Sequence, residues 1–549
     1  GVRGSGMALS RPGGARLTRA AYRRRAHYHR GSIDSGAMMA SEIWKGRWFA
    51  AMGLWLLAAT VASANEAEVA EAKAPVEPPW RVETRHQGQF GGQTLRYTAR
   101  VGEMQLVDAA GKPVAALCYT AYLVDSDRPR PVSFVFNGGP GSASVWLHMG
   151  LLGPQRVVLS SEADADDGAA PYRLAANPLA PLDLTDLVFV DPIGTGYSRV
   201  IGEGRNEDYW SMRGDTASIA QFVRRFVTEE QRWNAPKYLI GESFGTTRAA
   251  AVADALMGDG QDLALNGLVL ISQALDYTGS TPAPDNLIAH VTYLPTLAAT
   301  ARYHGRAGTD QPLTDWLAAA RRFAIDDYLP ALFRGAALPP ADRQRVAEGL
   351  SGFIGLPTDY ILRADLRVLA PRYVKELLRD QGLTVGRLDS RYLADESDDT
   401  AAEEELGDAA SNAISSAFTA ALNSYLSTSL DVHRNQPYLT DNDDLGEHWD
   451  YRLTPPDEYW EPLYVNTARS LTSAMRRNSQ LRVMVANGYY DLVTPFFDAE
   501  YTFGRHGIPT DRVQMRYYEA GHMMYLRQAD FEALLRDIRQ FYRSSDSGD

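Results

Sequence analysis

The chain has 549 residues, of which 45% are hydrophobic, and its net charge is −13. This length exceeds that of most single-core domains, although one elaborated α/β domain can reach it. Residues 1–64 carry a net charge of +8, which leaves −21 for residues 65–549. Such an acidic body argues against nucleic acid as a partner, because phosphate groups attract positive charge.

The basic start of the chain contains a predicted targeting segment. Lys45 and Arg47 precede an apolar run, residues 48–59, which is followed by the small residues Ala62-Ser63-Ala64. This order is typical of a secretory signal peptide, so the mature chain is expected to begin near Asn65. The apolar run is short for a membrane span, and an uncleaved anchor is the alternative interpretation.

Residues 1–37 precede two possible start residues, Met38 and Met39, and are interpreted as an overextended start. The protein is therefore expected to be exported, to a periplasm or outside the cell, with no membrane span after cleavage. Cys118 is the only cysteine, so no intramolecular disulfide can form, and export without disulfides favours a bacterial periplasm. The alternating pattern around Cys118 predicts a buried structural thiol.

Strand-like apolar runs alternate with helical patterns along most of the remaining chain. Several of the runs are continuously apolar, as expected for parallel strands buried on both faces. Helical spacing of apolar residues follows, for example at 219–227 and in a last helix at 528–543. The alternation predicts an α/β fold with a mostly parallel sheet. The predicted strands are 132–137, 186–191, 237–242, 268–272, 481–487 and 513–519.

The alternation breaks between about residues 280 and 475, where the pattern is mainly helical. We interpret residues 281–475 as an inserted helical cap. The parts of one α/β domain are then 65–280 and 476–549, after the excluded residues 1–64. An acidic run at 395–408 is interpreted as a solvated loop rather than a cation site.

The stretch "LIGESFGTTRAA" places Ser243 between two glycines where a strand should become a helix. This Gly-x-Ser-x-Gly pattern is typical of a nucleophile elbow, whose sharp turn leaves no room for neighbouring side chains. The alternative is an ordinary glycine-bounded turn in which Ser243 caps a helix. A serine nucleophile also needs a base and oxyanion donors.

Candidates for the base and the acid lie downstream of Ser243. His522 follows the last predicted strand directly, whereas His506 lies in a loop and is interpreted as a surface residue. Asp491 follows the strand at 481–487 and is the preferred acid, with Asp498 as the weaker candidate. Loops at the carboxyl ends of parallel strands form the active sites of α/β proteins. The alternative for Asp491 is a surface cap.

The oxyanion donors are expected to be backbone N–H groups. One should belong to Phe244, directly after the nucleophile, and the other to a glycine-rich loop after an earlier strand. The sequence "FNGGPGSAS" provides that loop, with Gly139 well placed to donate. The alternative is a simple Gly-Pro turn.

Five motifs, "NGGPGSAS", "DPIGTGYS", "GESFG", "NGYYDLVTP" and "AGHMMY", together resemble the serine carboxypeptidases. The resemblance runs from about residue 85 to 545 and is weakest in the cap. It implies an α/β-hydrolase fold with Ser243 as nucleophile, His522 as base and Asp491 as the acid. It also implies oxyanion donors at Gly139 and Phe244. Asn137 and Glu242 would bind the terminal carboxylate of a peptide substrate.

The sequence departs from the family pattern in four places. Ser142-Ala143-Ser144 stands where Cys-Ser-Ser is common, so a supporting disulfide is absent, and Val190-Asp191-Pro192 stands where the family has Asp-Gln-Pro. A second carboxylate-binding glutamate aligns with Leu151, which puts the grip on a free carboxylate in question. Arg248 follows the nucleophile by about one helical turn. It would either hold a substrate carboxylate or pair with a structural acid.

The resulting expectation is an exported serine carboxypeptidase that releases C-terminal amino acids from peptides. The mechanism needs neither a metal nor a cofactor. The alternatives are an esterase, an amidase or an acyltransferase built on the same triad. A catalytically inactive binding protein is a further alternative, and it predicts a missing triad residue. Oligomeric state and side-chain preference cannot be read from the sequence.

Overall fold

The computed structural model describes most of the chain. The segments predicted as a signal peptide and an overextended start lie outside the described residues. No helix in the described part of the chain is long and apolar enough to cross a membrane. The structure describes residues 76–546 except 160–162, 164–167, 259, 455–459 and 461–463, all of them within a compact unit, Val69–Asp549.

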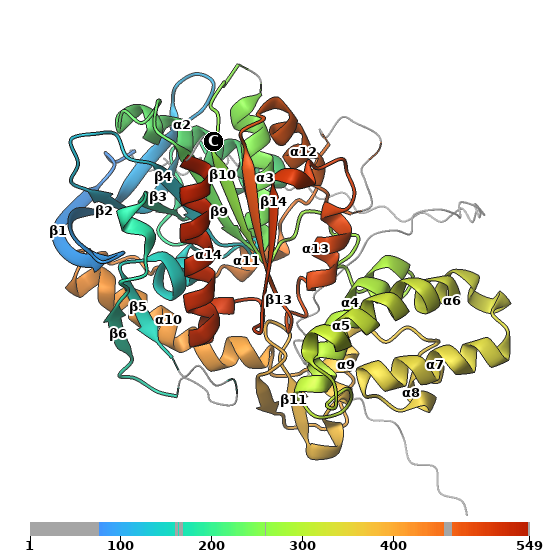
Figure 1. The fold of residues 1–549 in the computed structure, drawn as a ribbon. Helices are drawn as coiled ribbons and strands as arrows, with labels where there is room; N and C mark the ends of the chain where they lie inside the picture. The colour runs from blue at the N-terminus through green and yellow to red at the C-terminus, as the bar shows by residue number, and fades with distance from the viewer. Residues whose placement is uncertain are drawn as a thin grey trace, which may run out of the picture. The chain divides into compact units, whose positions relative to one another are not determined.

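A sheet of ten described strands forms the centre of the fold (Figure 1). Its order is β1-β2-β3-β7-β4-β9-β10-β13-β14, with β8 paired to β3. The six strands from β7 to β14 run parallel, while β1, β2, β3 and β8 join antiparallel. The strands are β1 Arg81–Phe90, β2 Gln93–Val107, β3 Pro113–Val124, β4 Val132–Phe136, β7 Asp186–Val190, β8 Arg199–Val200, β9 Lys237–Glu242, β10 Gly267–Ile271, β13 Arg482–Gly488 and β14 Val513–Tyr518.

The parallel strands are buried on both faces, which explains their continuous apolar runs. Alternate residues of one strand enter different cores, because successive side chains point to opposite faces. Leu239, for example, belongs to one core, whereas Tyr238 and Ile240 belong to the other. Each strand therefore joins two hydrophobic layers and is held from both sides.

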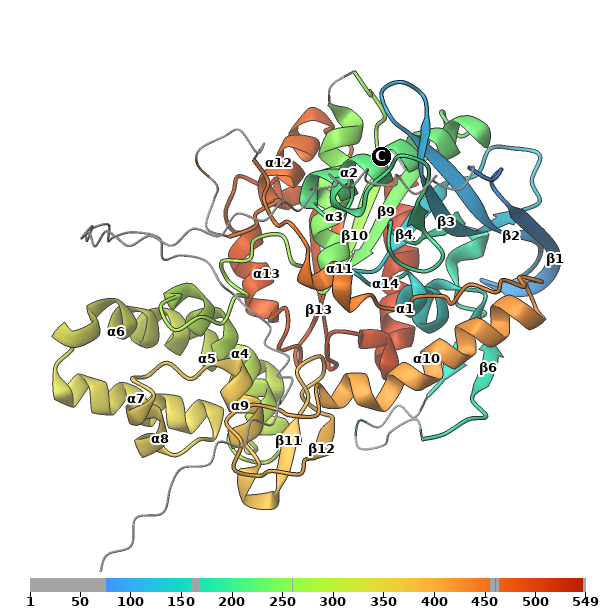
Figure 2. The same ribbon diagram turned by 180° about the vertical axis from the view of Figure 1, so that it is seen from behind.

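Helices cover both faces of the sheet. The helices α2 Met212–Glu229, α3 Phe244–Met257 and α12 Ala468–Arg477 pack on one face (Figure 2), and α14 Gln528–Asp546 packs on the other (Figure 1). A serine-bearing turn joins β9 to α3 in the middle of this sheet. This arrangement is the α/β-hydrolase fold, as the sequence predicted.

The segment between β10 and β13 contains a lobe of helices with its own hydrophobic core. This core also includes residues from the loop after β13 and from α13 Phe496–Phe503. The lobe therefore shares its hydrophobic core with the loop after β13, at the carboxyl edge of the sheet. Its helices are α4 Leu287–Tyr303, α5 Leu313–Phe323, α6 Leu329–Arg334, α7 Pro340–Ile354, α8 Thr358–Arg363 and α9 Ala370–Glu376.

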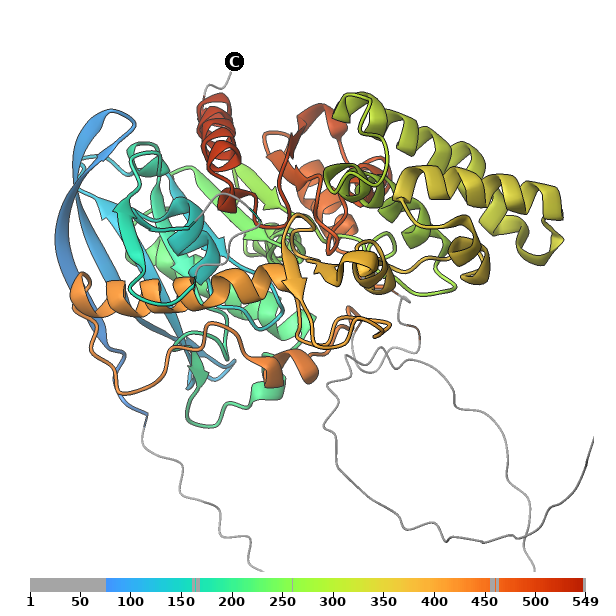
Figure 3. The ribbon, with the colours of Figure 1, turned by 90° about the horizontal axis from the view of Figure 1, so that it is seen from below.

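Helix α10, Ala409–Thr428, follows the lobe but belongs to a different core. Its buried residues pack in the cluster that contains α14 and one face of the sheet. Figure 3 shows α10 in orange, running beneath the sheet and apart from the green and yellow helices of the lobe. The segment predicted as one cap thus contains parts that pack in separate places, and its boundaries, 281–475, stay a prediction.

The remaining elements are short. The hairpin of β11 Leu383–Val385 and β12 Leu393–Asp395 lies between α9 and α10, and β5 Gln155–Val158 pairs with β6 Arg173–Ala176. Short helices are α1 Val145–Leu147 and α11 Asp443–Glu447. A π-helical turn covers His148–Leu152, and a 3-10 turn covers Met524–Leu526.

The predicted parallel strands are confirmed to within a residue or two at their ends. The antiparallel strands β1 and β2 were not among the predicted strands. Residues of β1 alternate between exposed and partly exposed, and few of them are apolar, so no hydrophobic run marks this strand. The acidic run at 395–408 differs from a purely solvated loop, because Glu396 is buried and pairs with Lys375, and Asp408 caps α10.

Candidate active site

The turn between β9 and α3 is strained at Ser243, whose φ is +59° and ψ is −130°. The two flanking glycines allow it. A Cβ atom on Gly241 would lie 2.1 Å from the carbonyl oxygen of Gly245, and one on Gly245 would lie 2.7 Å from the carbonyl oxygen of Phe136. Strain of this kind persists only where the surroundings enforce it, and it is common at functional sites. The turn therefore has the geometry of a nucleophile elbow, and the Ser243 side chain caps no helical N–H among the described residues.

The acid and base candidates lie together at the carboxyl edge of the sheet. His522 Nδ1 is 2.7 Å from Asp491 Oδ2, and both residues are buried. Asp491 Oδ1 accepts hydrogen bonds from the backbone N–H groups of Val493 and Thr494 at 2.8 and 2.9 Å. The Thr494 hydroxyl donates to Asp491 Oδ2 at 2.7 Å. These bonds fix the carboxylate, so that it can orient the imidazole ring.

The three candidates follow parallel strands in the same half of the sheet, in which β10 lies between β9 and β13. Ser243 follows β9, Asp491 follows β13 and His522 follows β14, and the carboxyl ends of parallel strands share one edge. The Ser243 N–H donates to the carbonyl of Ile271 at the end of β10, at 3.0 Å. The Ser272 hydroxyl donates to the carbonyl of His522 at 2.6 Å. Strand β10 thus links the serine turn to the histidine loop.

The glycine-rich loop after β4 packs against the serine turn. A Cβ atom on Gly138 would lie 2.6 Å from the Phe244 nitrogen and 2.9 Å from Ser243 Cβ. Gly139 has a φ of +100°, which a side chain would disfavour. The loop carrying Gly139 and the amide of Phe244 therefore lie beside each other, as an oxyanion hole requires.

Asn137 and Glu242 form a buried pair beside this loop. Asn137 Nδ2 donates to Glu242 Oε1 at 2.7 Å, while Asn137 Oδ1 accepts from the Leu147 N–H at 3.0 Å. The second bond orients the amide so that its NH₂ group faces the carboxyl group. Glu242 is 3% exposed, and its Oε2 atom has no hydrogen-bond partner among the described residues.

Burial raises the pKa of Glu242 to about 7, because a charged carboxylate loses hydration there. His522, Tyr525 and Asn137 oppose this rise, and Asp491 adds to it. Burial lowers the pKa of His522, but the charge and hydrogen bond of Asp491 raise it more, so the net direction is upward. Glu242 also raises the pKa of His522, which places the two groups within electrostatic reach of each other.

A loop of the inserted segment, residues 386–392, contacts both loops that carry the acid and the base. We call these residues the strap. The strap carbonyls of Arg387 and Leu388 accept the N–H groups of Leu492 and His522, at 2.9 and 2.6 Å. Asp389 Oδ2 accepts the Gly521 N–H at 3.1 Å. The strap joins β11 to β12, so the inserted segment helps to build the site.

Asp389 is itself fixed by a buried ion pair with Arg391, whose Nε lies 2.9 Å from Asp389 Oδ1. The sequence carries no local signal for the strap, so it could not be predicted. Its role depends on contacts across about 130 residues of chain between Asp389 and Gly521. Thr494 was also missed, although it lies within the "NGYYDLVTP" motif.

The structure distinguishes between the two roles considered for Arg248. Its side chain is 1% exposed, and Nε donates to Asp215 Oδ2 at 2.6 Å. Nη1 donates to the carbonyl of Asn137, also at 2.6 Å. Arg248 therefore pairs with a structural acid beneath the glycine-rich loop. Leu151 is fully buried in the π-helical turn, as an apolar residue would be.

The two weaker candidates lie elsewhere. Asp498 is fully buried in α13, where it accepts Gln273 Nε2 at 3.1 Å, and burial raises its pKa well above the ordinary value. His506 was interpreted as a surface residue, and this was wrong: its Nε2 lies 2.8 Å from Asp276 Oδ2, with only 16% of the side chain exposed. The reason is that its loop folds back onto the segment after β10.

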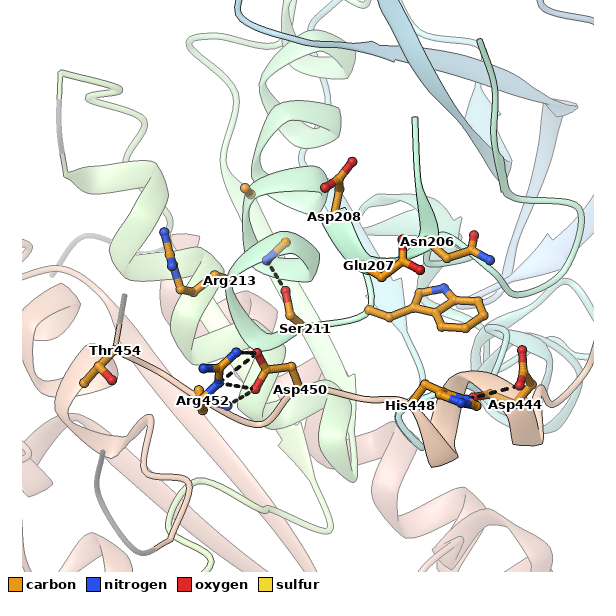
Figure 4. A pocket seen from close by; sticks show the side chains of 13 residues that line it. Asn206, Glu207, Asp208, Ser211, Arg213, Asp444, His448, Asp450, Arg452 and Thr454 are labelled. Atoms are coloured by element: carbon orange, nitrogen blue, oxygen red, sulfur yellow. Dashed lines mark hydrogen bonds and ion pairs between the residues drawn. The ribbon is translucent and has the colours of Figure 1, made fainter. Parts of the chain in front are cut away.

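A surface pocket of about 830 Å³ lies near the N-terminus of α2 (Figure 4). Its described lining includes Trp210, Arg452 and His448 but none of the three triad candidates. Arg452 makes a bidentate contact with Asp450, from Nε to Oδ1 at 2.9 Å and from Nη2 to Oδ2 at 2.6 Å, as the dashed lines show. Trp210 also packs in an apolar cluster with Phe244, the residue that follows Ser243.

Comparison with known proteins gives a match to the serine carboxypeptidase family over residues 107–281. Those residues include the glycine-rich loop and the serine turn, and the match ends before Asp491. The pheromone-processing carboxypeptidase KEX1 of Cryptococcus gattii is 33% identical over 132 residues, which is 24% of this chain. The aligned part covers only 18% of that relative's length.

Similar solved structures include a haloalkane dehalogenase variant from Bradyrhizobium elkanii, with 14% identity and a TM-score of 0.28. The alignment covers 85% of this chain and 98% of that one. Another is a soluble variant of the monoglyceride lipase of Saccharomyces cerevisiae, with 12% identity and a TM-score of 0.32. That alignment covers 87% of this chain and 99% of the lipase.

The family match and the carboxypeptidase relative agree with each other. The residues matched by the family, 107–281, include the "NGGPGSAS" and "GESFG" motifs on which the resemblance was based. Over residues 107–281 the chain is thus similar to the serine carboxypeptidase family.

Proposed function

We propose that this protein is a serine carboxypeptidase that removes the C-terminal amino acid from peptides. The observation that carries the proposal is the buried Asn137–Glu242 pair beside the serine turn. An esterase needs the triad and the oxyanion donors but has no use for a pair that recognises a free carboxylate. Asn137 donates N–H, and a protonated Glu242 donates O–H, so both suit a substrate carboxylate.

The proposed reaction has two stages. His522 takes the proton of the Ser243 hydroxyl as its oxygen attacks the last peptide carbonyl, and Asp491 stabilises the resulting imidazolium. The backbone N–H groups of Gly139 and Phe244 hold the oxyanion. The C–N bond breaks, and the departing amine takes the proton from His522. Water then attacks the acyl-enzyme in the same way and regenerates Ser243.

The first test is the substitution Ser243→Ala in the mature protein beginning at Asn65. Hydrolysis of a blocked dipeptide with a free C-terminal carboxylate should fall by several orders of magnitude, because the acyl-enzyme cannot form. The control is Ser415→Ala, which changes a serine of α10 whose hydroxyl donates to the carbonyl of Ser411 in the same helix. Near-normal hydrolysis by Ser243→Ala would overturn the assignment.

A second candidate function is an esterase, amidase or acyltransferase on the same triad. The position of Leu151 favours it, since the residue aligned with a second carboxylate-binding acid is a buried apolar side chain. In that case the amide or ester of a substrate would react as well as the free acid. From the sequence alone, we also propose that the protein is exported, that peptides are its substrates, and that it needs no cofactor.

A further inference from the structure

Tyr525 lies on the 3-10 turn just after His522, and its surroundings are unusual for a tyrosine. The side chain is 2% exposed, and its hydroxyl makes no hydrogen bond of good geometry among the described residues, although the side chains of Glu242 and Asn137 lie within reach of it. A buried hydroxyl without a partner costs stability, so native structures contain few of them. The buried Tyr525 hydroxyl therefore suggests a functional role at the candidate active site.

The Tyr525 ring is held in one place by close packing. A Cβ atom on Gly150 would lie 2.5 Å from Tyr525 Cε2 and 3.1 Å from a ring carbon of Phe418. Gly150 thus provides the space for the tyrosine ring, in the same π-helical turn that contains Leu151. The position of the hydroxyl is therefore set by the fold.

The hydroxyl lies near a second atom without a partner. Glu242 Oε2 is also buried and unpartnered among the described residues. Tyr525 lies close enough to Glu242 and Asn137 for each of them to act on its ionisation, and burial raises the pKa of Tyr525 well above its ordinary value. Tyr525 therefore stays a neutral O–H donor at any pH at which Glu242 titrates.

We propose that the Tyr525 hydroxyl binds the C-terminal carboxylate of the substrate, together with Asn137 and Glu242. The geometry leaves one donor of Tyr525 and one carboxyl oxygen of Glu242 unsatisfied in the same buried place, beside His522. A substrate carboxylate, with two oxygens, accepts from both of them when Glu242 is protonated. This inference rests on the proposed function and adds a specificity-determining residue to it.

Tyr525→Phe tests the inference, because it removes the hydroxyl and keeps the ring that packs on Gly150. Binding is measured by titration calorimetry at pH 6 in a Ser243→Ala background, which separates recognition from turnover. The probes are a blocked dipeptide with a free carboxylate and its C-terminal amide. Loss of a hydrogen bond to a charged group should weaken binding of the free acid about tenfold or more and that of the amide less than about twofold.

The matched control is Tyr373→Phe, which removes another buried tyrosine hydroxyl. Tyr373 lies in α9, and its hydroxyl donates to the carbonyl of Leu297 at 2.9 Å. Stability gives a second readout: the midpoint of thermal unfolding should fall in Tyr373→Phe and stay equal or rise in Tyr525→Phe. Removing an unpartnered polar group is neutral or favourable, whereas removing a paired one is not.

The outcomes separate this inference from the proposed function. Equal weakening of both peptides by Tyr525→Phe, or weakening of neither, overturns the role of Tyr525. The absence of any preference for the free acid in the Ser243→Ala protein overturns it as well. Failure of the proposed function would instead appear as a protein with the native residues that does not cleave the free-acid dipeptide.

Discussion

At the scale of the residue, the side chains of the candidate site are buried together with the groups that hold them in position. Asp491 has its oxygens occupied by backbone N–H groups, by Thr494 and by His522, so it has one orientation. Ser243 is held in a strained conformation by two glycines that tolerate no side chain. Pre-organisation of this kind keeps catalytic atoms in place without movement during the reaction.

Arg248 offers a test of position at the same scale. Arg248→Met should lower the free energy of unfolding by about 3–5 kcal/mol, because it leaves Asp215 buried without its cation. Urea denaturation measures the change. The double substitution Arg248→Met/Asp215→Leu should lose less than the single one, because no buried charge remains. A substrate-binding role for Arg248 would appear instead as a raised KM with unchanged stability.

The sequence could place the three triad candidates at one edge of the sheet because each follows a recognisable strand. The strands mark the carboxyl edge of the sheet, and the order Ser, Asp, His is that of the fold. Asp491 and Asp498 could not be separated with certainty by sequence, since both follow the same strand. The distance of 2.7 Å from Asp491 to His522 separates them. Burial and unpartnered atoms, such as the Tyr525 hydroxyl, leave no sequence signal.

At the scale of the element, the strap links the inserted segment to the acid and base loops. Four backbone groups of those loops form hydrogen bonds with strap residues. Three are N–H groups, which donate to the carbonyls of Arg387 and Leu388 and to the side chain of Asp389. The fourth is a carbonyl, which accepts from the N–H of Ser390. The position of His522 thus depends on a hairpin that precedes it by about 130 residues. The sequence pattern predicted a helical insertion here but not its contact with the site.

Gly521→Ala tests the strap directly. A Cβ atom there would lie 2.4 Å from the carbonyl oxygen of Leu388 and 2.4 Å from Asp389 Cβ, so the strap and the His522 loop must move apart. We expect kcat/KM to fall by about tenfold to a hundredfold, because small displacements of catalytic groups cause rate losses of this size. Steady-state hydrolysis of the blocked dipeptide measures the loss.

The control for this change is Gly352→Ala. Gly352 lies in α7, where a Cβ atom would meet no heavy atom within 4 Å. The change should leave kcat/KM unaltered and raise stability by up to about 1 kcal/mol, since alanine favours the helix. If Gly521→Ala retained full activity, the strap would have no part in positioning His522.

At the scale of the whole molecule, two hydrophobic layers and the core of the lobe meet around one edge of the sheet. The core of the lobe includes Tyr490 and Leu492, which flank Asp491 directly. The parallel sheet was predictable because its strands are apolar on both faces. The packing of the lobe against the loop that carries Asp491 could not be predicted, because it depends on contacts between distant segments.

In the proposed function, the buried Glu242 binds the free carboxylate of a peptide substrate. Its pKa of about 7 means that below this pH it is neutral and donates a hydrogen bond, and above it the carboxylate repels the substrate. The ionisation of His522 affects the hydrolysis of every substrate, so its effect cancels in the ratio of the kcat/KM values for two substrates. Glu242→Gln, a neutral donor at all pH values, should remove the pH dependence of that ratio.

The most direct measurement is kcat/KM for a blocked dipeptide with a free C-terminal carboxylate and for its amide, from pH 5 to 9. We predict that the free acid is preferred at low pH and that the ratio of free acid to amide falls as the pH rises through about 7. A ratio that stays constant across this range would contradict the role of Glu242 and favour an esterase or amidase on the same triad.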